Sequence, residues 1–282
     1  MATTSLRRVY GVLGFPVVHS LSPAMHNAAF TALSVDAEYR RFEVSPESLG
    51  YFFSSVRANN IYGFNVTIPH KETVMGLIDT VSDEAKLIGA VNTVKVWPQR
   101  LEGYNTDGDG FLQHLKEEVE FSPVLKEIAV LGAGGAARAV SVMLAKSGPR
   151  SIVIYDIDQT KRRALAEHLR LHFPDVSVTA VDSAAALGLS KADLLINATP
   201  IGMKPSDPSL IDGNDLHSGL IVYDLVYNPK ETKLLALARE KGCRTYNGLG
   251  MLLYQGMRSF EIWTGMKAPA QVMQQALNNS IN

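Results

Sequence analysis

Glu127-Ile-Ala-Val-Leu-Gly132-Ala-Gly134-Gly135-Ala-Ala137-Arg-Ala is the stretch that decides the fold. An apolar run typical of a β-strand ends at Gly132, and an alanine-rich run typical of a helix begins at Gly135. Gly132 allows a sharp turn off the strand, and the absence of a Cβ at Gly134 lets a pyrophosphate approach the backbone. The N–H groups and dipole of the helix N-terminus favour that anion. The stretch predicts a dinucleotide-binding turn, with Ala137 in place of the third glycine of the usual fingerprint.

The next predicted strand favours NAD over NADP. Ser151–Tyr155 reads as the second strand of the βαβ unit, and Asp156 follows it directly. A carboxylate at this offset accepts hydrogen bonds from the adenosine ribose hydroxyls and repels a 2′-phosphate. Asp158 either adds a second acid or caps the next helix. Arg162 and Arg163 lie one turn into that helix, within reach of a phosphate, so NADP remains the alternative.

Length and composition indicate a two-domain enzyme of the cytoplasm. The chain has 282 residues, more than one hydrophobic core usually supports. Its net charge is −1, and no basic stripe or apolar span predicts a nucleic-acid or membrane partner. The single cysteine, Cys243, excludes an internal disulfide and favours a reducing compartment. Residues 1–8 lack the apolar core of a signal peptide.

Strands and helices alternate along the chain, which predicts an α/β fold with largely parallel sheets. We expect a mostly parallel substrate-binding domain from residues 1–108 plus about 250–282, and a doubly wound Rossmann domain from about 109–249. Ser22 and Ser45 are predicted to cap the first two helices. The predicted strands are 9–15, 38–44, 61–66, 151–155, 176–180, 194–197, 220–224 and 244–246, with a hairpin at 90–105. The predicted helices are 23–33, 46–58, a short one from Pro69, 81–88, 109–119, 136–146, 232–241, 251–263 and 269–278.

Six polar clusters accompany the glycine turn. They are Ser20-Leu-Ser22-Pro-Ala-Met-His-Asn27, Asn65-Val-Thr67-Ile-Pro-His-Lys71, Gly89-Ala-Val-Asn92-Thr, Gly103-Tyr-Asn105-Thr106-Asp107, Asn197-Ala-Thr199-Pro200-Ile-Gly-Met203 and Asn247-Gly248-Leu-Gly-Met251-Leu-Leu-Tyr-Gln255. In this order, over residues 10–265, the seven motifs resemble the shikimate dehydrogenase family. Because the match is ordered and spans nearly the whole chain, it is far more specific than one short motif.

The resemblance implies reversible hydride transfer between NAD(P) and the ring alcohol of shikimate, a small-molecule substrate, by a monomer or homodimer. The alternative substrate is quinate, alone or beside shikimate. A catalytically idle NAD-binding sensor is the alternative of another class, and the presence of both Lys71 and Asp107 disfavours it. A folate-linked dehydrogenase of similar layout is disfavoured by the substrate-domain motifs.

The resemblance also implies a role for each matched residue. Lys71 and Asp107 match the catalytic pair, and Ser20 and Ser22 match the serines that hold the substrate carboxylate. Tyr227 matches a tyrosine near that carboxylate. The groups that hold the ring hydroxyls match Thr67, Asn92, Asp107 and Gln255. The cofactor-binding positions match Gly132, Ala133, Gly134, Gly135, Ala136, Asp156, Asp158, Asn197, Thr199, Pro200, Met203, Leu225, Gly248 and Met251.

The chemistry of the residues is compatible with those roles. Oxidising a secondary alcohol needs a hydride acceptor and a group that takes the hydroxyl proton. Lys71 is expected at the start of a helix, where a cation opposes the helix dipole, so a purely stabilising role is disfavoured. Lys71 would relay the proton while Asp107 orients the hydroxyl, and either residue is a candidate for the formal base.

The sequence departs from the family pattern at the cofactor. Many NADP-using members carry Asn-Arg-Thr after the second nucleotide strand, where the arginine binds the 2′-phosphate. Asp156-Ile157-Asp158 stands there in this chain, which resembles the NAD-preferring quinate/shikimate branch. No metal is predicted, because His168 and His172, four apart on a helix, have no third ligand nearby in sequence.

Overall fold

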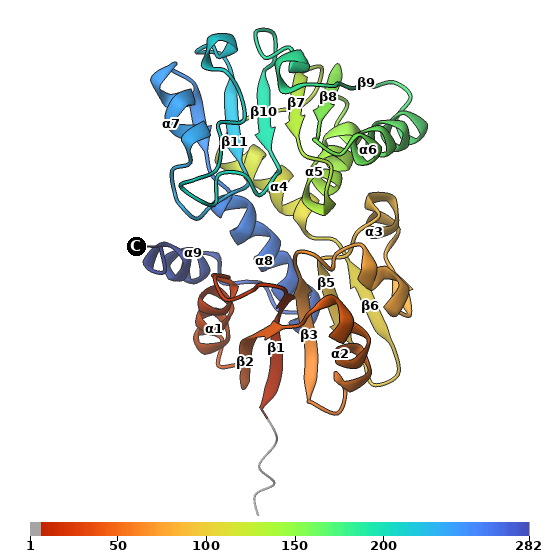
Figure 1. Ribbon diagram of the computed structural model, residues 1–282. Coiled ribbons are helices and arrows are strands. Elements are labelled where there is room, and N and C mark those ends of the chain that lie inside the picture. Colours follow the sequence, from red (N-terminus) through yellow and green to blue (C-terminus); the bar gives the residue numbers. More distant parts are fainter. Residues whose placement is uncertain (1–6, 282) are drawn as a thin grey trace, which may run out of the picture. The chain divides into compact units, whose positions relative to one another are not determined.

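The computed structural model describes residues 7–281 (Figure 1). Most of the N-terminal segment in which we looked for a signal peptide, residues 1–6, lies outside the described part. The chain divides into two compact units, Met1–Gly110 with Leu252–Asn282, and Phe111–Met251. Each unit has its own six-stranded sheet. The prediction of a two-domain α/β fold is confirmed. Among the described residues no helix is long and apolar enough to span a membrane.

The sheet of the first unit has the strand order β2-β1-β3-β5-β6-β4. Strand β1 (Arg8–Gly14) pairs in parallel with β2 (Ala37–Glu43) and β3 (Ile61–Val66). Strands β5 (Thr93–Val96) and β6 (Leu101–Tyr104) form the expected antiparallel hairpin, and β4 (Thr80–Val81) runs parallel to β6. The helices are α1 (Ser22–Ala32), α2 (Leu49–Ser55), α3 (Asp83–Ile88), the start of α4 (Asp107–Glu117), most of α8 (Leu249–Thr264), α9 (Ala270–Asn279) and the 3₁₀ turns η1 (Pro46–Ser48) and η2 (Thr73–Leu77).

Strand β1 is apolar on both faces because both faces of this sheet are covered. Successive strand side chains point to opposite faces. Tyr10 and Val12 pack in one cluster with residues of α1, α8 and α9, such as Trp263. Val9 and Leu13 pack in a second cluster with residues of α2 and β3. The near-continuous hydrophobic run of β1 is therefore that of a buried parallel strand.

The sheet of the second unit is all parallel, in the order β12-β11-β10-β7-β8-β9. Its strands are β7 (Glu127–Leu131), β8 (Ser151–Tyr155), β9 (Ser177–Ala180), β10 (Leu194–Asn197), β11 (Ile221–Asp224) and β12 (Arg244–Tyr246). Its helices include α5 (Gly135–Lys146), α6 (Gln159–His172), α7 (Lys233–Glu240) and the turns η3 (Ala184–Leu187) and η4 (Gly213–Asp215). From β7 the strands are added towards one edge of the sheet as far as β9, and from β10 they are added towards the other edge. Ligands of open parallel sheets bind at such a switch point, which here lies between β7 and β10.

Two local predictions in the first unit were wrong, and a third was right in position only. Ser22 is the first residue of α1, not its N-cap, and the capping position is Leu21 without a side-chain bond. Ser45 occupies the N-cap position of η1, as predicted, but its hydroxyl bonds the side chains of Ser48 and Glu47 rather than a backbone N–H. The short helix expected from Pro69 begins at Thr73 as a 3₁₀ turn. Lys71 therefore lies in the turn before it, and the helix-dipole argument for this lysine does not apply.

Candidate functional site

Lys71 and Asp107 form an ion pair in the first unit, next to the polar side chains of Asn92 and Gln255. Lys71 Nζ donates to Asp107 Oδ2 at 2.6 Å, and the two side chains are only 15% and 7% exposed. Lys71 follows β3, whereas Asp107 follows β6 and opens α4. Asn92 Nδ2 donates to the other carboxylate oxygen of Asp107 at 2.9 Å. Each oxygen of this buried carboxylate thus has a donor, as a buried charge requires.

Backbone contacts fix the orientation of the Asn92 amide. Asn92 Oδ1 accepts from the backbone N–H of Thr106 at 2.7 Å, so the NH₂ group must point the other way. There it faces Asp107 and also Gln255 Oε1, 3.4 Å away. The structure therefore brings together four residues that the sequence singled out, from four segments far apart along the chain. They are Lys71, Asn92, Asp107 and Gln255.

A buried hydroxyl cluster supports these side chains, and sequence analysis gave its members no role. The hydroxyls of Thr93, Thr106 and Ser259 lie 2.8–3.1 Å from one another. Asn65 Nδ2 donates to Ser259 at 2.9 Å and to Thr93 at 3.0 Å. Ser259 donates to the backbone carbonyl of Gln255 at 2.9 Å. Its position one helical turn after Gln255 was the available signal, because residues four apart share a helix face.

The two serines of the first motif differ in their surroundings. Ser22 is 5% exposed and hydrogen-bonds the phenol of Tyr39, whose hydroxyl donates to Asn65 Oδ1 at 2.7 Å. Ser20 is half-buried, and its hydroxyl accepts from the backbone N–H of Ser22 at 3.3 Å. The Ser20 hydroxyl only accepts in that bond and does not use its proton there, whereas the Ser22 hydroxyl is hydrogen-bonded to Tyr39, which in turn bonds Asn65.

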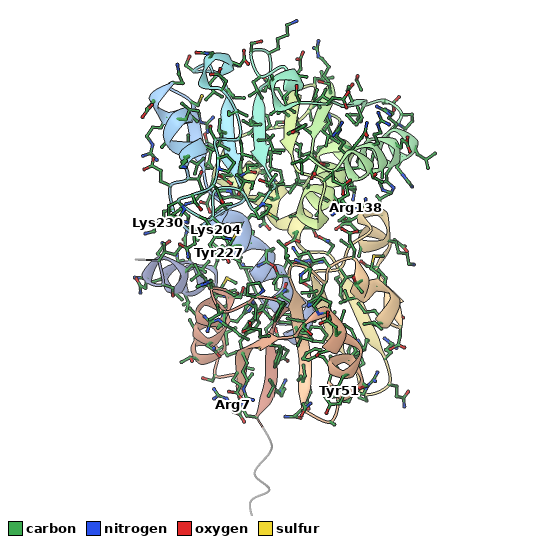
Figure 2. The ribbon with its side chains drawn as sticks, in the orientation of Figure 1. Arg7, Tyr51, Arg138, Lys204, Tyr227 and Lys230 are labelled. Carbon is green, nitrogen blue, oxygen red and sulfur yellow. The ribbon has the colours of Figure 1, made fainter. Side chains whose placement is uncertain are left out.

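The two remaining substrate-site predictions lie in different units. Thr67 follows β3, and its backbone N–H donates to the carbonyl of Leu13 at 2.8 Å, which ties the ends of β1 and β3. Tyr227, labelled in Figure 2, follows β11 and belongs to the second unit.

His26 is a buried imidazole inside the first unit. It stacks on the ring of Tyr39 at 4.4 Å, and neither ring nitrogen has a hydrogen-bond partner among the described residues. Burial lowers the pKa of His26 from 6.5 to about 3. The folded protein therefore keeps this ring neutral while the unfolded chain binds a proton below pH 6.5, so stability falls as the pH drops from 6.5 towards 3.

His26→Phe is expected to reduce this acid sensitivity. Between pH 7.5 and pH 5 the free energy of unfolding should fall by about 2 kcal/mol more in the wild type than in the variant. The difference arises because pH 5 lies about 1.5 units below the His26 pKa of 6.5 in the unfolded chain. Urea unfolding at the two pH values measures the difference. The control is His172→Phe at an exposed site, which should keep the wild-type loss. An equal loss in wild type and His26→Phe would contradict the prediction.

The glycine turn of the second unit fits a pyrophosphate. Gly132 has φ +108°, and a Cβ there would lie 2.9 Å from the carbonyl oxygen of Ala198, so this position requires glycine. Gly134 is the N-cap of α5, and nothing lies within 4 Å of where its Cβ would be. The N-terminus of α5 therefore has room for a ligand beside Gly134, and Gly135 and Ala136 lie in the first turn of this helix.

Asp156 is fixed beside the glycine turn. Its carboxylate accepts from the backbone N–H groups of Ala133 at 2.7 Å and Asp158 at 2.8 Å. Asp158 is the N-cap of α6, with its carboxylate on the N–H groups of Thr160 and Lys161, which was one of its two predicted roles. The side chain of Ile157, between these acids, is 91% exposed.

The loops after β10 and β11 are joined through a buried acid that sequence analysis did not single out. Asp224 is fully buried and accepts from Asn197 Nδ2 at 2.8 Å and Thr232 Oγ1 at 2.6 Å. Burial raises the pKa of Asp224. Asn197 also donates to Ile201 O and accepts from Thr199. Asn197 and Asp224 therefore shape the segment that ends at Met203.

The other predicted cofactor positions follow strands of the same sheet. A Cβ on Gly248 would lie 2.1 Å from the carbonyl oxygen of Leu225, so Gly248 allows a close backbone contact between these two loops. Pro200 and Met203 are exposed, whereas Met251 is buried. Because all strands run parallel, these loops share the carboxyl edge of the sheet with the glycine turn and Asp156.

The paired histidines of α6 do not form part of a larger cluster. The rings of His168 and His172 lie 4.3 Å apart. Among residues 7–281 no group of three or more His, Cys, Asp or Glu side chains is arranged to hold a metal ion.

Comparison with known proteins identifies the family. The family model for the shikimate dehydrogenase substrate-binding domain matches residues 12–94, and that for the shikimate 5′-dehydrogenase C-terminal domain matches residues 248–277. Residues 127–228 match the NADP oxidoreductase, coenzyme F420-dependent, model. The chain is 47% identical over 280 residues to a shikimate dehydrogenase (NADP(+)) of Methanopyrus kandleri, covering 95% of this chain and 94% of that protein.

Two solved structures agree over nearly the full length. A shikimate dehydrogenase in complex with NADP+ superposes with a TM-score of 0.90 at 41% identity, covering 98% of this chain and 96% of the other. A shikimate 5-dehydrogenase from Listeria monocytogenes in complex with shikimate and NAD has a TM-score of 0.88 at 36% identity, covering 98% of both chains. With the ordered motifs and the two sheets, these matches make the chain a member of the shikimate dehydrogenase family of nicotinamide-dependent oxidoreductases.

Proposed function

We propose that this protein catalyses reversible hydride transfer between NAD and the ring alcohol of shikimate. The observation that carries the proposal is the Lys71–Asp107 ion pair at 2.6 Å, with Asn92 Nδ2 donating to the same carboxylate and Gln255 Oε1 3.4 Å from that Nδ2. An enzyme that oxidises an alcohol needs a proton acceptor beside hydrogen-bonding groups for its substrate. We assign residues 1–108 and about 250–282 to substrate binding, and about 109–249 to the cofactor.

The ion pair handles the hydroxyl proton as a unit. NAD, when bound, supplies the hydride acceptor. Asp107 accepts a hydrogen bond from the reacting hydroxyl, and its orientation is held by Asn92 Nδ2. As the hydride leaves, Asp107 takes the hydroxyl proton; the Lys71 ammonium, with Nζ 2.6 Å from Asp107 Oδ2, releases one of its own protons and regains one from Asp107, which restores the ion pair. Because Lys71 retains 15% exposure, it can pass the proton on to water.

The remaining roles are those that the family resemblance implies. Ser20, Ser22 and Tyr227 would hold the substrate carboxylate, and Thr67 and Gln255 its ring hydroxyls. The N-terminus of α5 with Gly132–Ala136 would bind the pyrophosphate, and Asp156 the adenosine ribose. The nicotinamide would be flanked by Asn197, Thr199, Pro200, Met203, Leu225, Gly248 and Met251.

An activity panel tests the proposal. Purified protein is mixed with NAD and either shikimate, quinate or an unrelated secondary alcohol, and absorbance of the reduced cofactor is followed. Reduction with shikimate supports the proposal, and reduction with quinate alone would assign a quinate dehydrogenase. Cofactor binding without reduction of any substrate would overturn catalysis in favour of a sensor.

Loss of the serine hydroxyls is expected to weaken binding more than turnover. A carboxylate anchor acts equally in the ground and transition states, so its removal raises KM with little change in kcat. Ser20→Ala should raise the KM for shikimate about 10- to 100-fold, from about 1.5–3 kcal/mol per charged hydrogen bond. Steady-state kinetics measure both constants for Ser20→Ala, Ser22→Ala and the double variant.

Ser45→Ala is the matched control, since that hydroxyl bonds the nearby Ser48 and Glu47 and lies outside the proposed site. Its KM should equal that of the wild type. An unchanged KM in the Ser20→Ala/Ser22→Ala double variant would reject the anchor role.

The wild type is expected to use NAD with at least about ten times the catalytic efficiency of NADP, because Asp156 repels a 2′-phosphate. Ile157, 91% exposed, offers no donor to that phosphate. The double variant Asp156→Asn/Ile157→Arg should shift the preference towards NADP by removing a charge and adding a bidentate phosphate partner. Kinetics with each cofactor at saturating shikimate measure the ratio.

Leu171→Arg, at an exposed apolar position at the far end of α6, adds the same charge as Ile157→Arg but away from Asp156, and should leave the cofactor ratio unchanged. A higher wild-type efficiency with NADP would overturn the assignment of NAD.

A further inference from the structure

A buried arginine, Arg162, contacts the backbone of Asp156, directly after β8. Arg162, on the first turn of α6, is 6% exposed. Its Nη1 donates to the backbone carbonyl of Asp156 at 2.9 Å. Its Nη2 forms an ion pair with Asp182, which follows β9 and whose side chain is 82% exposed. The remaining guanidinium nitrogen, Nε, has no partner among the described residues.

The guanidinium depends on Asp182 for charge compensation. A peptide carbonyl neutralises no charge, and Asp182 is the carboxylate that the described residues pair with Arg162. Loss of Asp182 would leave the guanidinium, on a side chain that is only 7% exposed, without a carboxylate partner and would favour its binding to another anion. The neighbouring Lys161 is exposed and lies 4.0 Å from Asp158. Arginine, with its planar fork of donors, is the better partner for a phosphate.

We propose that Asp182 is a cofactor-specificity residue that acts through Arg162. Because Asp182 pairs with the Arg162 guanidinium, this group does not bind a 2′-phosphate on the adenosine ribose that Asp156 would bind. Asp182 and Asp156 thus disfavour a 2′-phosphate in different ways, one by occupying the cation and the other by repulsion. The inference rests on the proposed function only in placing the adenosine ribose at Asp156.

Direct binding of nucleotide fragments tests this role without turnover. Adenosine 5′-monophosphate and adenosine 2′,5′-bisphosphate differ only in the 2′-phosphate, and isothermal titration calorimetry gives the Kd of each. Asp182→Asn should tighten binding of the bisphosphate about tenfold, in the range of one charge-assisted contact. Binding of the monophosphate should change less than twofold. The gain should vanish in Arg162→Gln/Asp182→Asn, which has the same loss of the acid but no guanidinium.

Asp175→Asn is the charge-matched control, at an exposed acid in the turn before β9. It should leave both Kd values unchanged, because the effect is local rather than one of net charge. Asp182→Ser serves as a second variant should Asp182→Asn fold poorly, as judged by circular dichroism. Equal tightening of both nucleotides, or a gain that survives loss of Arg162, would overturn the inference. Failure of the wild type to bind adenosine 5′-monophosphate would instead overturn the proposed ribose site, and the inference with it.

Discussion

Lys71→Ala is expected to lower kcat by about 10²–10⁴-fold, the range for a positioned proton-transfer group. The KM for shikimate should change only a few-fold, because Asn92, Asp107 and Gln255 stay in place to hold the substrate. The physical reason is the placement of Nζ 2.6 Å from Asp107 Oδ2 in a side chain that is 15% exposed. Steady-state kinetics in the direction of alcohol oxidation measure both constants.

Lys71→Arg separates proton transfer from charge. Arginine keeps a cation beside Asp107 but does not release its proton at accessible pH. If Lys71 relays the proton, Lys71→Arg should be nearly as slow as Lys71→Ala. Lys86→Ala is the control, since that exposed lysine pairs with Asp83 at 3.2 Å on α3, outside the cluster. Near-normal kcat in Lys71→Ala would show that the lysine is a bystander.

The parts of the fold that depend on local sequence were predicted well. The glycine turn, the strands on either side and the hairpin at β5 and β6 follow from hydrophobic period and turn residues. The need for glycine at position 132 could be predicted from the sequence, because a strand followed at once by a helix allows the connecting residue few other conformations. Alternation of strands and helices then placed the loops at one sheet edge, since parallel strands end together.

One error fell where a long-range contact decides local structure. Ser22 was predicted to cap a helix because a serine directly before Pro23 is typical of an N-cap, but its hydroxyl bonds Tyr39 on β2. No local pattern reports such a partner. Lys71 was placed on a helix because Pro69 often opens one, whereas the chain makes a turn first and the 3₁₀ segment begins at Thr73.

The hydroxyl cluster was missed for the same reason, and its one local signal was the spacing of four residues between Gln255 and Ser259. Ser259 contacts Thr93 and Asn65, which lie 166 and 194 residues away in the chain. A serine within an amphipathic helix looks like any half-polar position until the sheet that it packs against is known. Motif resemblance supplied the side chains that we propose to face the substrate, but not those that hold them in place.

Asp107→Asn is expected to impair both binding and turnover, lowering kcat by about 10²-fold or more and raising KM about tenfold. The amide has nearly the shape of the carboxylate, but it carries no charge for Lys71 and cannot take a proton. One of its two polar atoms becomes an NH₂ group, which would face a donor on either side, Lys71 Nζ or Asn92 Nδ2. The same kinetic measurements give both constants.

Asp109→Asn is the matched control for Asp107→Asn, because Asp109 is the other acid in the first turn of α4. If the carboxylate at 107 only complements the helix dipole, the two variants should behave alike, with a loss of stability of about 0.3–1 kcal/mol and normal turnover. The double variant Lys71→Ala/Asp107→Asn tests whether the pair acts as a unit. Groups that share one proton step are strongly non-additive, so the double variant should be little slower than the worse single one. Multiplicative losses would instead assign the two side chains to independent roles and overturn the joint handling of the proton.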